Sequence, residues 1–291
     1  MYHDFFTGVL EQSLGRRIPI SRSLALGGGS INKAYKLETA EGDFFLKFNS
    51  GEKLDMFFRE KEGLELLKEK GFGCIPRLHG MGLEGSRSYL LMEYWKPARR
   101  QADYWERLGE ELARLHRNTQ DCFGLDQDNY IGSLPQTNNP LQNGFDFLVT
   151  NRLEVQVKRA YDQNYLSKAH VSSFEQLYGM LPGLLPDEPP ALLHGDLWSG
   201  NVITSPSGEA GLIDPAVYYG FREMDLAFSK LFGGFSDSFY EAYQSRFPLE
   251  PDFSDRLDLY NLYPLLVHLN LFGMGYQSDV LRIIKHFTHK Q

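Results

Sequence analysis

The stretch from His194 to Asn201 (HGDLWSGN) carries side chains well suited to chemistry. Asp196 and Asn201 lie within it, and Asp214 follows after two short apolar runs. A carboxylate can orient an attacking hydroxyl group and accept its proton, and asparagine and aspartate oxygens are ligands that Mg²⁺ prefers. A base together with such ligands is the equipment of phosphoryl transfer, in which a metal ion neutralises the phosphate charge.

The segment between Asn201 and Asp214 predicts a hairpin. Residues 202–204 and 210–213 have strand character, and the intervening sequence SPSGE has turn chemistry. A hairpin folded about Ser207 would set Asn201 nearly opposite Asp214. We therefore expect these two side chains to converge on one metal ion.

The spacing from Asp196 to Asn201 is also that of a protein-kinase catalytic loop, in which the aspartate is the base and the asparagine binds metal. The alternative is structural, with Asp196 and Asn201 capping turns and Asp214 ending a strand. We interpret His194 as a structural residue that positions the loop.

Lys47 is the second candidate, because it lies in an aromatic-rich strand-like run where its ammonium group could meet ATP phosphates. Glu60 is the expected partner. On a helix it shares a face with Phe57, Leu64 and Leu67, at offsets of three, four and seven. That face must point inward, and an inward carboxylate needs a cation. The alternative is a surface lysine and a glutamate that reaches solvent.

A glycine-rich loop precedes Lys47 by about twenty residues. Consecutive backbone amides in such a loop can form an anion-binding nest for phosphates. It is neither a Walker A loop nor a strict GxGxxG, and three glycines alone are more often a plain turn. The expected nucleotide contacts here are Gly27, Gly28, Gly29, Ser30 and Asn32.

Two kinds of region must position these residues. The first third of the chain predicts strands at 35–38, 44–48 and 89–94 with a helix over 54–70, and helical periodicity dominates afterwards. The later helices are expected at 105–115, 144–162, 170–180, 223–232, 237–246 and 254–271. This predicts an α+β, bilobal, protein-kinase-like fold, with a small β-rich N-lobe (1–94) and a larger α-helical C-lobe (95–291). The join would be a hinge whose backbone at Glu93 and Trp95 could bind adenine.

Composition narrows the class of protein. The chain has 291 residues and a formal net charge of −8, which argues against binding to a nucleic-acid backbone. No run reaches the ~20 apolar residues needed to cross a bilayer. Neither a signal peptide nor a metal-binding spacing of Cys74 and Cys122 is evident, so a cytoplasmic protein is expected, with a monomer as the default.

The sequence resembles the fructosamine kinase (ketosamine-3-kinase) family, within the wider aminoglycoside-phosphotransferase and protein-kinase-like group, over nearly the whole chain. The narrowest motifs are HGDLWSGN and the run that begins IDPAVYYG at Ile213 and continues through Arg222-Glu223 to Asp225-Leu226-Ala227. Further family-like segments are the Gly27–Asn32 loop, 128–138 and 231–235.

The resemblance implies an ATP- and Mg²⁺-dependent kinase that phosphorylates the 3-hydroxyl of a ketosamine, small or protein-bound, and so leads to deglycation. Under it Asp196 is the base, Asn201 and Asp214 bind magnesium, and Lys47 with Glu60 position ATP. Asp225 would brace the catalytic loop. The implied substrate-side residues, for which packing roles are equally open, are Trp198, Tyr219, Asn129, Gln136 and Asn138.

The sequence also departs from its relatives. Gly144 stands where many relatives have a tryptophan, and the glycine loop lacks the cysteine of some relatives, so no redox-linked dimer through that loop is expected. Asp214-Pro215-Ala216 replaces Asp-Phe-Gly, which argues against a mobile switch of that type. Two other functions stay open: a kinase of the same fold for an aminoglycoside, choline or thio-sugar, and a nucleotide-binding pseudokinase.

Overall fold

The computed structural model describes residues 2–27 and 31–288, and the chain divides into two compact units. The first unit comprises residues 1–107 and 201–215, and the second comprises 108–200 and 216–291. The sequence placed a single lobe boundary after residue 94. In the structure the chain leaves the second unit after Gly200, contributes a hairpin to the first unit, and returns after Pro215.

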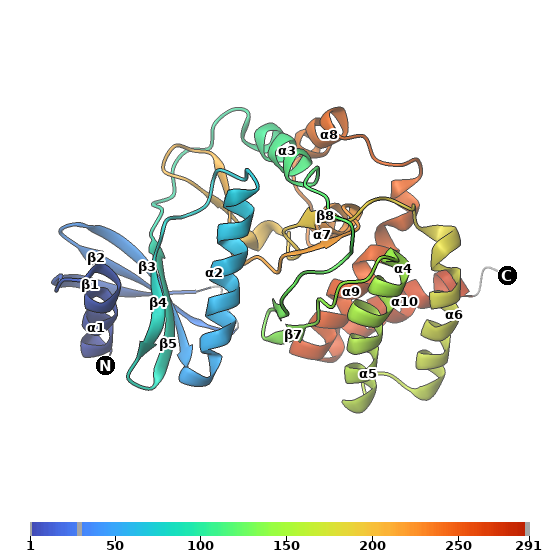
Figure 1. The fold of residues 1–291 in the computed structure, drawn as a ribbon, viewed down its shortest axis with the longest axis horizontal. Coiled ribbons are helices and arrows are strands. Elements are labelled where there is room, and N and C mark those ends of the chain that lie inside the picture. Colours follow the sequence, from blue (N-terminus) through green and yellow to red (C-terminus); the bar gives the residue numbers. More distant parts are fainter. Residues whose placement is uncertain (1, 28–30, 289–291) are drawn as a thin grey trace. The chain divides into compact units, whose positions relative to one another are not determined.

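The first unit is built on a five-stranded antiparallel sheet with the strand order β1-β2-β3-β5-β4 (Figure 1). Its elements are α1 (His3–Leu14), β1 (Ile20–Leu26), β2 (Lys33–Thr39), β3 (Gly42–Ser50), a 3₁₀ turn (Gly51–Lys53), α2 (Leu54–Glu69), β4 (Leu78–Glu84), β5 (Arg87–Glu93), β9 (Val202–Thr204) and β10 (Ala210–Leu212). Helix α3 (Tyr104–Leu115) begins in this unit and continues into the second.

The alternation of side chains along β3 sorts the two faces of this sheet. Phe44, Leu46 and Phe48 pack in one apolar cluster with Phe5, Val9 and other residues of α1. Successive side chains of a strand point to opposite faces, so Lys47 projects to the other face. Helix α2 meets Lys47 there through Glu60, and Figure 1 shows α1 and α2 on either side of the strands.

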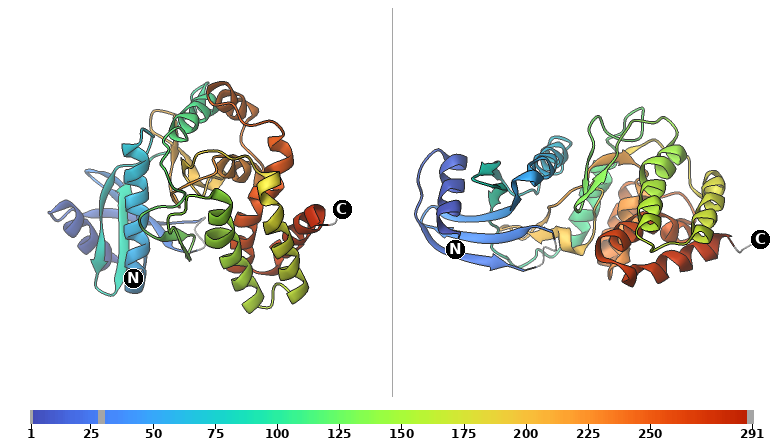
Figure 2. Two further views of the ribbon diagram at one scale, coloured as in Figure 1. Left: turned by 45° about the vertical axis from the view of Figure 1, so that its right-hand side comes forward. Right: turned by 90° about the horizontal axis from the view of Figure 1, so that it is seen from below.

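The second unit is mainly helical. Its elements are β6 (Asn129–Ile131), β7 (Leu134–Gln136), α4 (Gly144–Leu148), a π-helical turn (Val149–Leu153), α5 (Glu154–Asp162), α6 (Lys168–Leu184), β8 (Ala191–Leu193), a 3₁₀ turn (Ser199–Asn201), β11 (Tyr218–Gly220), α7 (Glu223–Leu231), α8 (Asp237–Arg246), α9 (Phe253–Phe272), a 3₁₀ turn (Met274–Tyr276) and α10 (Gln277–Thr288). Figure 2 shows α5, α6, α9 and α10 packed together. Helix α9 is the hub, because it contacts α5, α7 and α10.

Most of the predicted elements are confirmed. The strands around Lys47 are β2, β3 and β5, the predicted helix 54–70 is α2, and the later helical segments correspond to α3 and to α4 through α9. The helices α1 and α10 and the strands β4, β6, β7, β8 and β11 were not predicted. Gly144 is buried at the start of α4, where the rings of Phe123 and Phe221 fill the space that a larger side chain would need.

Candidate functional site

The ammonium group of Lys47 is held between two carboxylates of the first unit. Its side chain is buried, its Nζ lies 2.9 Å from Glu60 Oε1, and it contacts Asp214 Oδ1 more closely still. Burial alone would lower the pKa of Lys47, but Asp214 and Glu60 together raise it well above its ordinary value. The raised pKa keeps Lys47 positively charged at neutral pH, which is a property that its predicted role in phosphate binding requires.

Glu60 lies on the inward face of α2, as its spacing predicts. Phe57, Leu64 and Leu67 on the same face are fully buried, whereas the side chain of Glu62 is 43% exposed. Burial raises the pKa of Glu60, and the neighbouring Asp214 carboxylate raises it further, against the lowering effect of Lys47. A second carboxylate beside Lys47 therefore makes ionised Glu60 costly while no other cation is present.

The predicted hairpin is present and brings Asn201 to Asp214. Strands β9 and β10 pair with Val202 opposite Leu212, and the Ile213 amide donates to the Asn201 carbonyl at 3.1 Å. Asp214, the next residue, has a φ of 56°, in the left-handed region that non-glycine residues rarely adopt. Such backbone strain is concentrated at functional sites.

This pair of oxygen ligands fits Mg²⁺. Magnesium keeps several water molecules and commonly uses only one or two protein carboxylates together with substrate phosphates. Residues 2–27 and 31–288 contain no group of three or more His, Cys, Asp or Glu side chains that could hold a metal ion. Asn201 and Asp214 would supply two oxygen donors, so the remaining ligands of a bound Mg²⁺ ion would come from water and phosphates.

The hairpin is anchored to the body of the first unit along its length. Leu212 donates its amide to the Cys74 carbonyl at 3.2 Å, and Arg107 forms an ion pair of 2.8 Å with Glu209. The Trp95 ring packs so closely on Gly211 that a Cβ there would lie 2.4 Å from it. These contacts fix the strand that carries Asp214 relative to the sheet that carries Lys47.

The remaining predicted nucleotide contacts lie at the ends of strands. Asn32 accepts a hydrogen bond of 2.9 Å from the side chain of Asn49, which also donates to the Ile31 carbonyl. Asn49 thus anchors the end of the glycine loop, a role that the sequence did not suggest. Gly27 is exposed and precedes β2, while Gly28, Gly29 and Ser30 lie outside the described residues.

At the hinge, the Glu93 amide already donates to the Arg77 carbonyl at 2.8 Å. An adenine base at this position would therefore have to use the Glu93 carbonyl and the peptide groups of Trp95. Trp95 also supplies the ring that packs on the hairpin, so one residue would connect a predicted adenine contact with the strand leading to Asp214.

In the second unit, Asp225 holds the backbone of the HGD motif. Its carboxylate accepts hydrogen bonds from the amides of His194 (2.8 Å) and Gly195 (2.9 Å). The fully buried His194 ring accepts from the Asp196 amide at 3.3 Å, which is a positioning contact. Gly195 has a φ of 80°, and a Cβ there would lie 2.0 Å from the Ala216 carbonyl, so this position requires glycine.

His116 is a supporting residue that the sequence did not reveal. Its ring is fully buried between Asp225 (Nε2 to Oδ2, 3.2 Å) and the hydroxyl of Tyr243 (Nδ1 to Oη, 2.8 Å). It therefore orients the Asp225 carboxylate, which holds the backbone of the HGD motif. The only sequence signal is a histidine at the end of an amphipathic helix, which is too common to single it out.

The three implied substrate-side amides are buried and form a network with one another. Asn129 donates to the Val217 carbonyl (2.8 Å) and accepts from Gln136 (2.8 Å) and Asn138 (3.0 Å). Gln136 also donates to the Ala216 carbonyl at 3.1 Å. With at most 6% of each residue exposed, these amides bind backbone and each other, which is the packing alternative that the sequence left open.

The two implied aromatic contacts differ in exposure. Tyr219 is 7% exposed on β11, where its amide and carbonyl both bond to Gly124. Trp198 is half-buried, with its ring 5.9 Å from that of Phe232 and packed on Gly200. Of the implied substrate-side residues, Trp198 therefore offers the most accessible surface.

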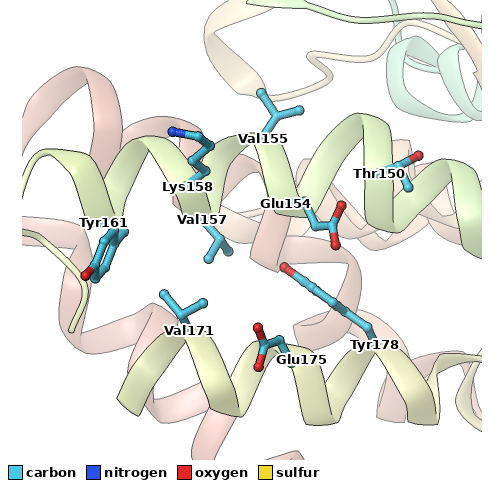
Figure 3. A pocket seen from close by; sticks show the side chains of 9 residues that line it. All are labelled: Thr150, Glu154, Val155, Val157, Lys158, Tyr161, Val171, Glu175 and Tyr178. Atoms are coloured by element: carbon cyan, nitrogen blue, oxygen red, sulfur yellow. The ribbon is translucent and has the colours of Figure 1, made fainter. Parts of the chain in front are cut away.

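A separate cavity of about 450 Å³ lies between α5 and α6 (Figure 3). Val157, Val171 and Tyr178 line its apolar part, and Glu154 and Glu175 stand at its rim. It contains none of the predicted site residues. The predicted site residues therefore lie outside this cavity.

The chain was compared with known proteins. The family profile described as "Fructosamine kinase" matches residues 4–290. A probable ketoamine kinase of Enterococcus faecium is 39% identical over 89% of this chain and 93% of its own length, and a chloroplastic protein-ribulosamine 3-kinase of Arabidopsis thaliana is 37% identical over 94% and 84%.

This chain is also similar to solved structures of kinases. The crystal structure of a candidate fructosamine-3-kinase from Thermobifida fusca is 30% identical over 96% of both chains, with a TM-score of 0.82. A choline kinase from Streptococcus pneumoniae, at 18% identity and a TM-score of 0.65 over 97% of both chains, shares the fold. The predicted α+β protein-kinase-like fold is thus confirmed. The chain belongs to the fructosamine kinase family and is an ATP-dependent phosphotransferase that acts on a hydroxyl group.

Proposed function

We propose that this protein phosphorylates the 3-hydroxyl of a ketosamine, a sugar-derived glycation adduct, with Mg²⁺-ATP as the phosphoryl donor. The 3-phosphate that results is labile, so the amine is released and the reaction leads to deglycation. Support comes from relatives named ketoamine kinase and protein-ribulosamine 3-kinase over most of the chain. The single structural observation that carries the proposal is Lys47, held as a cation by Glu60 and Asp214.

In this proposal Lys47 binds the ATP phosphates while Glu60 keeps its ammonium group in place. Asn201 and Asp214 would hold Mg²⁺, which would supply positive charge against the phosphates. Because Lys47 now contacts Asp214, nucleotide binding must free that carboxylate by giving Lys47 phosphate oxygens in exchange. Glycine-loop amides, with Gly27 and Asn32 at the ends of the loop, would bind further phosphate oxygens.

Asp196 acts as the base in this proposal. Its carboxylate orients the acceptor hydroxyl and takes the proton as the bond from that oxygen to the γ-phosphorus of ATP forms and the bond from the γ-phosphorus to ADP breaks, with ADP as the leaving group. Asp225 and His194 fix the backbone of the loop, so that the Asp196 side chain is held in one place without itself being buried. The half-buried Trp198 ring would offer an apolar surface to the C–H face of a sugar.

The test is a substrate panel. The protein is incubated with Mg²⁺-ATP and, separately, with ribulosamines, fructosamines, aminoglycosides and choline, and ADP release and the phosphorylated product are followed. Turnover of ribulosamines or fructosamines with phosphate on the 3-hydroxyl is the expected result. Turnover confined to aminoglycosides or choline would refute the ketosamine assignment, and tight ATP binding without any turnover would indicate a pseudokinase.

None of the helices within residues 2–27 and 31–288 is long and apolar enough to cross a membrane. Cys74 and Cys122 are both free thiols.

A further inference from the structure

Arg152 is a buried charge without an ionic partner. It is 0% exposed, and no carboxylate lies within 4.0 Å of it in the described part of the chain. The other buried arginines, Arg222 and Arg256, are paired with Glu188 and Glu223. Burial of an unpaired charge is costly, so Arg152 must be compensated in another way or serve a purpose.

Dipoles and aromatic rings compensate this charge. The guanidinium donates to the Thr137 carbonyl at 2.5 Å and to the Asn138 side-chain oxygen at 2.7 Å. Its central carbon lies 3.9 Å from the centre of the Tyr218 ring and 4.6 Å from that of Phe147. Stacking of a guanidinium group on aromatic rings stabilises a desolvated cation.

The bond to Asn138 connects Arg152 to the chain segment that follows Asp214. Asn138 donates to Asn129, and Asn129 donates in turn to the Val217 carbonyl. Gln136, which donates to Asn129, also binds the Ala216 carbonyl. Arg152 thus lies at the far end of a network that holds two consecutive carbonyls of this segment.

The same segment holds the catalytic loop. The Ala216 amide donates to the His194 carbonyl at 2.9 Å, two residues before Asp196. Tyr263 closes the network, because its hydroxyl donates to the Gln136 oxygen at 2.7 Å. Burial raises the pKa of Tyr263, Arg152 lowers it, and the Asp196 charge raises it again, so both charges reach this phenol.

The backbone around Arg152 has an unusual local geometry. Arg152 lies in the π-helical turn Val149–Leu153 between α4 and α5. Isolated π-helical turns are rare and occur frequently at functional sites. In this turn the side chain of Arg152 is fully buried and its guanidinium group stacks on the ring of Tyr218.

We propose that Arg152 is a positioning residue for Asp196. Through Asn138, Asn129 and Gln136 it fixes the Ala216–Val217 segment and with it the HGD loop, and it supplies the positive charge at the centre of this part of the second unit. This inference rests on the proposed role of Asp196 as the base. We expect Arg152 to affect the chemical step but not the binding of ATP, because the proposed ATP ligands lie in the first unit.

The test compares Arg152→Met and Arg152→Lys with the wild-type protein. Each is assayed with a ketosamine and Mg²⁺-ATP for kcat and for the KM of ATP, at a temperature at which thermal unfolding shows the protein folded. Arg256→Met is the matched control, since it removes another buried arginine from the same unit but one that pairs with Glu223. Tyr263→Phe removes a single hydroxyl from the network and tests the idea if Arg152→Met fails to fold.

We expect Arg152→Met to lower kcat by about 100-fold, because a misplacement of about 1 Å at a catalytic group costs that much. The KM of ATP should stay within about twofold. Arg152→Lys should recover part of the loss, Tyr263→Phe should lower kcat by a smaller factor, and Arg256→Met should lower the Tm without lowering kcat.

The inference would be overturned if a folded Arg152→Met protein had the kcat of the wild type. If Arg152→Met does not fold, it would be overturned by wild-type kcat in both Arg152→Lys and Tyr263→Phe. An equal loss of kcat in Arg256→Met, or a KM of ATP that rises in step with the fall in kcat, would also overturn it. If the wild-type protein turns over no ketosamine, the proposed function fails instead. The same kcat comparison is then made on ATP hydrolysis, where Asp196 would orient water, and a loss there still supports the role of Arg152.

Discussion

Replacement of Glu60 by glutamine separates what this residue does for stability from what it does for function. Glu60 is 11% exposed at its side chain, and burial together with the Asp214 carboxylate raises its pKa to about 7, from 4.5. Below about pH 7 the folded protein without ligands therefore favours the neutral form of Glu60, and above that pH the ionised form carries a free-energy cost. Glutamine resembles that neutral form and keeps an oxygen for Lys47.

The raised pKa of Glu60 determines how the stability of the folded protein changes with pH. A raised pKa contributes stability that is fully present below pH 4.5 and is lost as the pH rises through about 7. The pKa rises by about 2.5, from 4.5 to about 7, and at about 1.4 kcal/mol for each pH unit the pH-dependent change in the free energy of unfolding is at most roughly 3.5 kcal/mol. In the absence of nucleotide and Mg²⁺, Glu60→Gln should therefore equal or exceed the wild-type Tm at pH 8 and show a smaller advantage at pH 5.

Glu60→Gln should lower the activity with ATP, even where it raises the Tm. Without the Glu60 charge, Lys47 keeps only Asp214 as an ionic partner, so it is drawn toward a proposed magnesium ligand and away from the phosphates. Glutamine keeps the hydrogen bond but removes the ionic attraction, so the cost is at most the about 1.5–3 kcal/mol of a hydrogen bond to a charged group. With about 1.4 kcal/mol for each factor of ten, kcat/KM for ATP should fall by at most about 10- to 100-fold.

The assays are thermal unfolding at pH 5 and pH 8 and steady-state kinetics with varied ATP. Glu62→Gln is the matched control, because Glu62 lies on the same helix with its side chain 43% exposed and pairs with Arg59. It should change neither kinetics nor Tm appreciably. A Glu60→Gln protein that is less stable than wild type at pH 8 and retains its kinetics for ATP would refute this reasoning.

Three further predictions concern the HGD loop. Asp196→Asn should abolish turnover while ATP affinity, measured by nucleotide titration, stays nearly intact, and collapse of ATP binding would show that Asp196 is not the base. Asp225→Asn turns the NH₂ group of the new side chain toward the backbone amides of His194 or Gly195, which are themselves donors. One buried unsatisfied donor costs about 1–3 kcal/mol, so both the Tm and kcat should fall. Gly195→Ala must overcome a φ of 80° and a contact of 2.0 Å with the Ala216 carbonyl, so turnover should be lost even where circular dichroism shows a folded protein.

Several features of the site are local in sequence, and these could be predicted. The offsets of Phe57, Leu64 and Leu67 from Glu60 predict which side of α2 faces inward, and all three are fully buried. The turn sequence SPSGE predicts the hairpin between Asn201 and Asp214, and the observed register confirms it. A helix face and a tight turn depend on residues a few positions apart, so short stretches of sequence contain the information.

Elements that depend on distant partners were not predicted. Strand β4 (LHGMGLE) contains two glycines and no β-branched residue, yet it forms the sheet edge because β5 supplies its hydrogen bonds and α1 packs against it. Asn129, Gln136 and Asn138 resemble ligands for sugar hydroxyls in sequence. In the structure their partners are backbone carbonyls eighty or more residues away and a guanidinium from the π-helical turn.

By itself the sequence determined the family, through its resemblance to known members, and with it the kinase fold. The pairing of Lys47 with Glu60 and the hairpin between Asn201 and Asp214 follow from helical periodicity and turn chemistry. Only the tertiary structure decided that Asp225 is oriented by His116, that Arg152 is buried without a carboxylate, and that Lys47 contacts Asp214 as well as Glu60. The physical reason is that the energy of a buried polar group depends on the partners that folding brings to it, and those partners lie far away along the chain.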